Sequence, residues 1–139
     1  MPSASTEFVR SIVASWERGD FGSIEWAHPE IEFVIADGVS PGQWSGRTGM
    51  VEGWRDFLSA WDDWRSEAQS YRELDDGRVL VLSRFAGRGR TSGLELERVQ
   101  ATGAALYQVR DGKVIRLVLY MDAERALAEV GLAPEVGSA

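Results

Sequence analysis

The chain has 139 residues, the length of one ordinary domain that can bury its own core. It has no cysteine and one histidine, His28, which excludes disulfides, thiolate chemistry and metal sites built on several histidines. The net charge of −7 argues against a nucleic-acid partner. The apolar runs are too short to span a bilayer, and residues 1–6 lack a secretory-signal pattern. We therefore expect a cytoplasmic protein with no membrane partner.

The first half of the chain has apolar residues at helical spacing in two segments. Gly19 is a stop signal for the first helix, and the residue before Pro29 leaves the helical region. The elements expected here are a helix whose apolar stripe runs from Phe8 to Trp16, a short helix over residues 20–26, a strand over 31–36, a loop over 37–46, and a helix whose stripe runs from Met50 to Trp61.

The second half of the chain is rich in strands separated by strong turn signals. We expect strands over residues 66–74, 79–86, 94–109 and 114–121. The strand over 79–86 is apolar on both faces at first, so both faces should be covered. A change of apolar phase in the strand over 94–109 predicts a bulge. Asp122 should cap a last short helix that ends at Gly131.

This order of elements predicts a single α+β domain over residues 1–139, with no internal repeat. The simplest arrangement is a strongly bent antiparallel sheet that forms a cone, closed on one side by the N-terminal helices. Ile115, Leu117 and Leu119 alternate with Val114, Val118 and Tyr120 on the last strand, so both of its faces are apolar. One face can serve the interior of the cone. A partner subunit would cover the other, which predicts a homodimer through the sheet.

Several short sequence motifs, spread along nearly the whole chain, resemble those of a known family. They are Arg18-Gly19-Asp20-Phe21, His28-Pro29-Glu30-Ile31-Glu32-Phe33, Ser45-Gly46-Arg47, Arg110-Asp111-Gly112-Lys113-Val114-Ile115 and Tyr120-Met121-Asp122. In this order and spacing the chain resembles the SnoaL-like branch of the nuclear transport factor 2-like superfamily. The resemblance implies the cone-shaped fold, but it does not give the function, because this fold hosts many activities.

The resemblance to ketosteroid isomerase within that superfamily points to Asp37 as a general base, nine residues before Gly46. The family's oxyanion-stabilising tyrosine and acid fall on Ile12 and near Ala105, and neither residue can donate a side-chain hydrogen bond. The acid–base aspartate of the polyketide cyclases also falls near Ala105. An aspartate of the limonene-type epoxide hydrolases falls on Leu119, which speaks against that activity. The alternative for Asp37 is a turn before Gly38.

Large and small apolar residues suggest a ligand pocket. Trp16, Trp54 and Trp61 can form an aromatic wall beside Ile12, or can simply pack in the core. Small residues around Ala105 leave room for a ligand or allow the sheet to bend. Tyr107, on the same face as Ala105, is a candidate hydrogen-bond donor. The apolar residues Leu117 and Leu119 of the last strand complete the expected pocket.

Three polar residues have two interpretations each. His28 is either a proton carrier or, as we favour, a boundary residue before Pro29. Arg84 and Glu97 interrupt strand-like stretches, and an inward Arg84 would indicate anion binding, although outward placement is commoner.

The leading hypothesis is a protein that binds a small apolar molecule in a cavity, with acid–base chemistry at Asp37 of the isomerase, cyclase or lyase type. No motif in the sequence indicates a metal or another cofactor. The alternative is a non-catalytic dimeric interaction or assembly module, whose cone would be filled by its own tryptophans.

Overall fold

The structure is a computed structural model that describes residues 4–18, 24–37, 41–59, 61–74, 77–89 and 99–131. For residues 61–64, 87–89 and 99–101 the description covers the backbone alone. The elements are α1 (Ala4–Glu17), β1 (Ala27–Ile35), β2 (Gly42–Ser45), α2 (Gly46–Ser59), β3 (Trp61–Glu73), β4 (Arg78–Gly89), β5 (Val99–Arg110), β6 (Lys113–Tyr120) and α3 (Ala123–Glu129).

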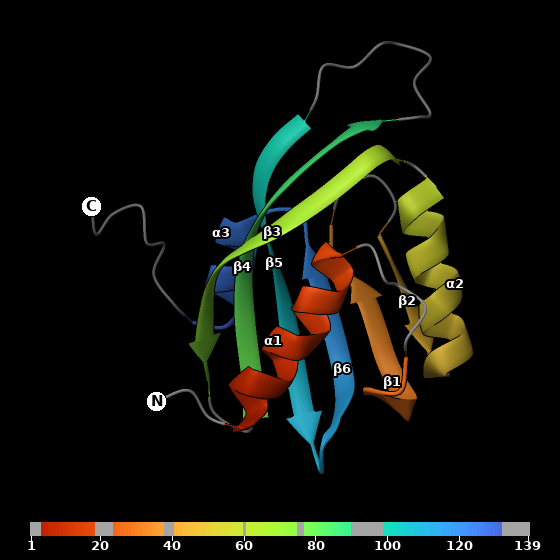
Figure 1. Ribbon diagram of the computed structural model, residues 1–139, viewed down its shortest axis with the longest axis vertical. Coiled ribbons are helices and arrows are strands. Elements are labelled where there is room, and N and C mark those ends of the chain that lie inside the picture. The colour runs from red at the N-terminus through yellow and green to blue at the C-terminus, as the bar shows by residue number, and fades with distance from the viewer. Residues whose placement is uncertain are drawn as a thin grey trace.

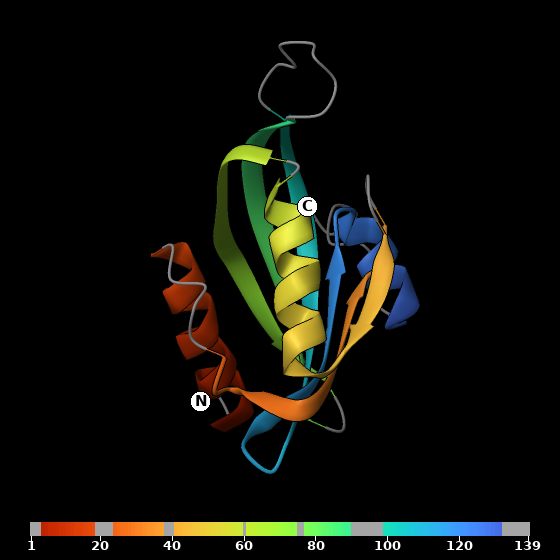
Figure 2. The same cartoon turned by 90° about the vertical axis from the view of Figure 1, so that its right-hand side faces the viewer.

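The strands form one curved sheet in the order β2-β1-β6-β5-β4-β3 (Figure 1). All neighbouring pairs are antiparallel except β1 and β6, which are parallel. Helices α1 and α3 lie on opposite sides of the sheet (Figure 2). We call the face that packs against α1 and α2 the inner face, and the face that packs against α3 the outer face. The α+β fold with a bent sheet closed by helices is the one that the sequence predicted.

Strand β4 contributes apolar side chains to a buried core on each face of the sheet. Its side chains alternate, so Val79 and Val81 join the inner core while Leu80 and Leu82 join the outer core. The inner core also takes Val9, Ile12 and Val13 from α1, which recur at helical spacing on one side of that helix. The prediction that this strand is covered on both faces is therefore confirmed.

The outer face of the sheet is covered by α3 of the same chain. The Asp122 side chain caps this helix by accepting a hydrogen bond from the Glu124 backbone N–H at 3.0 Å. Ala123, Ala126 and Leu127 then pack in one cluster with Val118 and Tyr120 of β6. The outer face of β6, which we expected a partner subunit to cover, is thus covered by α3 of the same chain. The homodimer stays a prediction, but the exposed apolar face no longer supports it.

The last strand differs from the predicted alternation at its start. Val114 and Leu117 both belong to the inner core, although they were expected on opposite faces. On β5, Gln108 pairs with Arg116 of β6, and the next residue, Val109, pairs with Val114. The register of the two strands therefore shifts at this point. Ile115 is the extra residue of this bulge, and it shifts the alternation of inner and outer side chains on β6 by one residue.

Four boundaries in the first half also differ from expectation. Strand β1 begins at Ala27 rather than at residue 31, and Pro29 lies where the pairing with β6 is irregular, so its missing N–H breaks no regular ladder. Residues 24–26 are not helical, and residues 19–23 lie outside the described part. The expected loop over 37–46 contains β2, which pairs with β1. Trp61 opens β3 instead of ending α2.

The predicted hairpins β3–β4 and β5–β6 are both present, while residues 75 and 76 of the first turn lie outside the described part. Gly77 and Gly112 have φ values of +72° and +74°, and Gly131, after α3, has +79°, which is backbone that suits glycine. The bulge predicted in the strand over 94–109 falls partly on residues 94–98, which lie outside the described residues. From Val99 to Gln108, β5 pairs with β4 without a shift.

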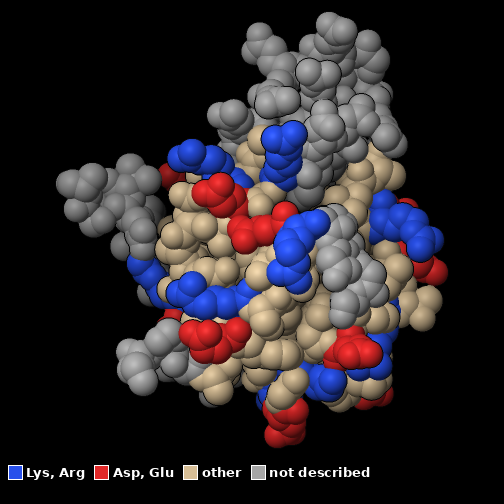
Figure 3. All heavy atoms as spheres, viewed as in Figure 1, with Lys and Arg blue, Asp and Glu red and all other residues tan. Residues whose placement is uncertain are grey.

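On the face seen in Figure 3, acidic and basic side chains are interspersed rather than gathered by sign. Among the helices in the described part of the chain, none is long and apolar enough to cross a membrane.

Candidate functional site

A cavity of about 590 Å³ lies between the two N-terminal helices and the inner face of the sheet. Trp16 and Val13 of α1 and Trp54 and Phe57 of α2 border it on the helical side. The sheet side comes from β3 to β6 and includes Val81, Ser83, Gly103, Ala105, Tyr107 and Leu119. This volume is within the range of small-molecule sites in proteins.

The helical side of the cavity is a stack of flat aromatic rings. Trp16 and Trp54 lie with centroids 5.0 Å apart and planes at 19°, and Trp54 and Phe57 lie 5.3 Å apart at 9°. Two rings fix this stack from behind by edge contacts: Trp26 against Trp16 and Phe33 against Trp54. Trp16 and Trp54 are thus held in place by neighbouring rings before any ligand arrives.

The sheet side of the cavity is lined by small residues at its centre. Ala105 pairs with Val81 on β4 and with Leu119 on β6, and Gly103 pairs with Ser83. A Cβ at Gly103 would lie 2.6 Å from the carbonyl oxygen of Tyr120, so glycine is required for the close approach of β5 and β6. The space opposite the aromatic wall is therefore empty because these strand residues are short.

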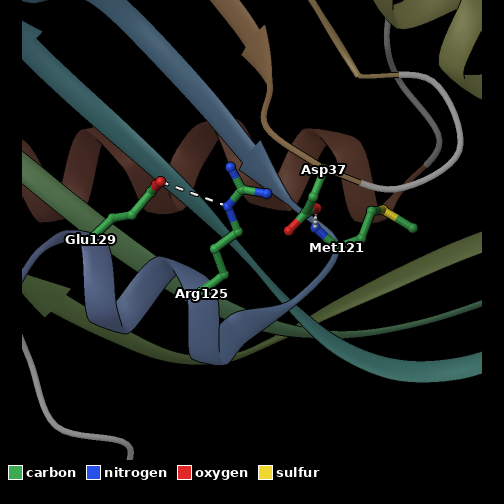
Figure 4. A network of polar contacts seen from close by, with 4 residues as sticks. All are labelled: Asp37, Met121, Arg125 and Glu129. Carbon is green, nitrogen blue, oxygen red and sulfur yellow. Dashed lines mark hydrogen bonds and ion pairs between the residues drawn. The ribbon is translucent and has the colours of Figure 1, made fainter.

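Asp37 lies at the end of β1, and its carboxylate ties that end to β6. Its Oδ1 accepts a hydrogen bond of 2.5 Å from the Met121 backbone N–H. Its Oδ2 is buried and has no hydrogen-bond partner among the described residues. Asp37 does not border the cavity, but Met121 does. Figure 4 shows this bond, with the Arg125 side chain of α3 extending toward the carboxylate and paired with Glu129 at 3.6 Å.

The structure brings together five of the residues proposed for the pocket: Trp16, Trp54, Ala105, Tyr107 and Leu119. Ile12 is buried in the core beside the cavity rather than on its wall. Leu117 borders a smaller pocket of about 30 Å³ behind Trp16 and Trp54. The Trp61 side chain lies outside the described residues, although its backbone belongs to β3, so it is not part of the α2 stripe.

Several cavity residues were missed by reasoning from the sequence. Val13 and Phe57 belong to the same helical stripes as Trp16 and Trp54, so helical spacing already contained the signal for them. Ser83, Gly103 and Met121 carry no such signal, because only the pairing of β4, β5 and β6 brings them to one place.

The structure describes two of the three polar residues that had two interpretations, Arg84 and His28. Arg84 is exposed, lies opposite Glu67 across β3 and β4, and borders the cavity together with Glu67. His28 Nδ1 accepts a hydrogen bond from the Glu30 backbone N–H at 3.0 Å, which fits a boundary residue. Glu97 lies outside the described residues. Within the described ranges, no three His, Asp or Glu side chains gather into a metal-binding group.

All three tyrosines of the sheet have pKa values above the ordinary value, and the shifts are largest for Tyr107 and Tyr120. Burial raises the pKa of Tyr107, and the neighbouring Tyr71 adds to the shift. Burial also raises the pKa of Tyr120, with a further contribution from its hydrogen bond to Glu129. Both hydroxyls therefore keep their protons at neutral pH, and Tyr107 presents a neutral phenol at the cavity.

Comparison with known proteins places the chain within this fold. The model of the SnoaL-like domain matches residues 9–117. An NTF2-like protein of unknown function from Burkholderia pseudomallei is 15% identical with a TM-score of 0.74, over 94% of this chain and 99% of that one. A putative polyketide cyclase from Xanthomonas campestris is 20% identical with a TM-score of 0.67, over 91% and 96%.

A third similar structure is that of TerC co-crystallised with polyporic acid. It is 22% identical with a TM-score of 0.69, over 91% of this chain and 97% of TerC. A search of curated protein sequences found no match. At these identities the solved structures support the fold, and function has to be argued from the site.

Proposed function

Because the chain belongs to the SnoaL-like domain family, we propose that it binds a planar, largely apolar small molecule in the cavity beneath α1 and α2. The observation that carries this proposal is the opposition of the Trp16–Trp54–Phe57 stack to the short side chains around Ala105. The rings of the stack face one another, so a ligand would meet their edges and the outer faces of Trp16 and Phe57, and the short side chains opposite leave room for a flat molecule. Polyporic acid in the TerC crystals and the description of another relative as a putative polyketide cyclase agree with an organic ligand.

The alternative of an interaction module required the tryptophans to fill the cone. Trp16 and Trp54 stack on each other and border the cavity instead of occupying it. That arrangement supports a ligand-binding role over a purely structural one, because an apolar space of this size lowers the stability of the fold, and ligand binding offsets that cost.

Ligand binding is tested by tryptophan fluorescence, because two of the six tryptophans border the cavity. Fluorenone is a planar ketone, and adamantanone is a compact, globular ketone that serves as the matched control. We expect saturable quenching by fluorenone and about tenfold weaker binding of adamantanone, measured by its competition. Equal affinities would contradict a planar site, and the absence of saturable binding by either ketone would contradict the proposed function.

Acid–base chemistry at Asp37 is a second candidate, and one atom favours it. The Oδ2 of Asp37 is buried, has no hydrogen-bond partner among the described residues, and belongs to a residue bonded to the cavity-lining Met121. An unpaired carboxylate oxygen can take a proton from one carbon of a ligand and return it to another, which here requires that the ligand reach past Met121 to Asp37. The reaction class would be a cofactor-independent isomerisation, cyclisation or elimination at a carbon next to a carbonyl.

The test is exchange of the α-protons of β-tetralone in D₂O, followed by NMR. The Asp37→Asn variant keeps an oxygen that accepts from the Met121 N–H but cannot shuttle the proton. We expect this variant to lose the enzyme-dependent exchange by at least about 100-fold. Exchange at the wild-type rate in the Asn variant would exclude Asp37 as the base and leave the binding proposal intact.

A further inference from the structure

Tyr107 is the polar group placed deepest among the large buried side chains of the inner face. It is 1% exposed, lies between Val79 and Leu117 on the neighbouring strands, and borders the cavity. Its ring lies 6.2 Å from that of Trp16, tilted by 41°, so the phenol meets the aromatic wall at one end of the cavity. A buried tyrosine hydroxyl normally finds a hydrogen-bond partner.

The two buried tyrosines of the sheet differ in this respect. Tyr120 points to the outer face, where its hydroxyl shares a hydrogen bond with Glu129 of α3. The pKa of Tyr107 is raised by burial and by Tyr71, and no hydrogen bond to a side chain contributes to that shift. The fold thus holds one phenol hydrogen-bonded against α3 and one protonated phenol at the cavity.

The strand register places this donor far from Asp37. Tyr107 lies opposite Leu117, and Met121, which is bonded to Asp37, is four residues farther along from Leu117. At roughly 3.3 Å per strand residue, the two polar groups are separated by about 13 Å along the sheet. They stand near opposite ends of the cavity, so one ligand atom cannot contact both.

We propose that the Tyr107 hydroxyl donates a hydrogen bond to a carbonyl-type oxygen of the bound molecule and so determines which edge of a flat ligand enters first. This inference rests on the proposed binding function and deepens it by naming the class of ligand. The ligand is a planar, mostly apolar molecule that carries an acceptor oxygen on its leading edge. Tyr107 is then a specificity-determining residue, because a ligand without that oxygen would leave the buried donor unpaired.

The test compares fluorenone with fluorene, which has nearly the same shape but no oxygen. In the wild-type protein we expect fluorenone to bind about five- to tenfold more tightly than fluorene, the range of one net hydrogen bond. In Tyr107→Phe the affinity for fluorenone should fall to that for fluorene, and the affinity for fluorene should not change. The carbonyl stretching band of bound fluorenone should lie at lower frequency in the wild type than in Tyr107→Phe.

The control variant is Thr6→Val, which removes a buried hydroxyl that donates to Glu73 and does not border the cavity, and it should change neither the affinities nor the carbonyl band. If Tyr107→Phe binds fluorenone as the wild type does, with the same carbonyl band, the role of Tyr107 is overturned while the binding function stands. If the wild type binds neither molecule, the binding function fails and this inference fails with it. A shift of the band that Thr6→Val reproduces would likewise overturn the role of Tyr107.

Discussion

On the outer face of the sheet, small helix residues sit on large strand residues, whereas on the inner face large helix residues stand opposite small strand residues. Ala123 and Ala126 of α3 share one buried apolar cluster with Leu80 and Leu82 of β4. Trp54 of α2 lies across from Ala105, and a cavity of about 590 Å³ remains between them. The same sheet thus supports a filled core on one side and a binding site on the other. The difference follows from where the short side chains are placed, because a short residue on a strand leaves space that a rigid aromatic stack cannot collapse to fill.

The largest contrast is expected from truncating a leucine on each face. Leu80 on the outer face is 0% exposed, so Leu80→Ala should lower the free energy of unfolding by about 2–5 kcal/mol, measured by urea denaturation. Leu119 borders the cavity and is only partly buried, so Leu119→Ala should cost less. Equal losses of unfolding free energy in the two variants would contradict the difference between a filled outer face and an open inner face.

Adding volume should reverse the pattern. Ala105→Leu fills space that is already empty, so we expect a stability change below about 1.5 kcal/mol but at least about a tenfold loss of fluorenone affinity. Ala126→Leu makes the same change in α3, where the residue is fully buried and the core is dry. It should destabilise the protein by about 1–3 kcal/mol and leave the affinity unchanged. Titration and unfolding of both variants check this, and an affinity loss in Ala126→Leu alone would contradict it.

The raised pKa of Tyr107 predicts a dependence of stability on alkaline pH. Below pH 10 the phenol carries its proton in both the folded and the unfolded chain, so its contribution is constant. Above pH 10.0, the ordinary tyrosine pKa, the unfolded chain releases the proton and the folded chain keeps it, which favours unfolding. Stability should fall by as much as ~1.4 kcal/mol per pH unit for this residue. Tyr107→Phe should flatten the curve of unfolding free energy above pH 10, and an unchanged slope would show that Tyr107 ionises freely in the fold.

The smallest effect concerns the cap that seats α3 on the outer face. Asp122→Ala removes the acceptor for the Glu124 N–H and should cost about 1 kcal/mol, while Asp122→Asn should keep most of the stability. Amide hydrogen exchange should quicken mainly within α3. Fluorenone affinity should not respond, because α3 lies on the side of the sheet away from the cavity. A change in affinity would mean that the two faces are coupled.

Local chemistry was enough to predict some elements of the fold. Asp122 and Gly131 mark the ends of α3, and Gly77 and Gly112 mark two hairpins, because caps and turns depend on neighbours in the sequence. Trp61 was misassigned because its spacing from Phe57 and Leu58 fits a helix, while its place is decided by pairing with Gly89 across the sheet. Strand β2 was missed since four residues in a Gly- and Pro-containing segment carry little periodic signal.

The candidate site was predictable in part for the same reason. Helical spacing identified Trp16 and Trp54, and strand alternation put Ala105 and Tyr107 on one face. The meeting of Ser83, Gly103 and Met121 depends on the register of three strands, which no local pattern encodes. Asp37 was proposed from a resemblance, and the structure adds that its carboxylate holds the Met121 N–H. Its use as a base remains a prediction.

The most direct test of a binding site on the inner face is methyl NMR of the protein titrated with fluorenone. We predict saturable shifts for the methyl groups of Ala105, Val81 and Leu119, which border the cavity, and none for Leu80, Ala126 and Leu127 on the outer face. Shifts confined to the outer-face methyls, or no saturable shift at any of the six residues, would contradict the account.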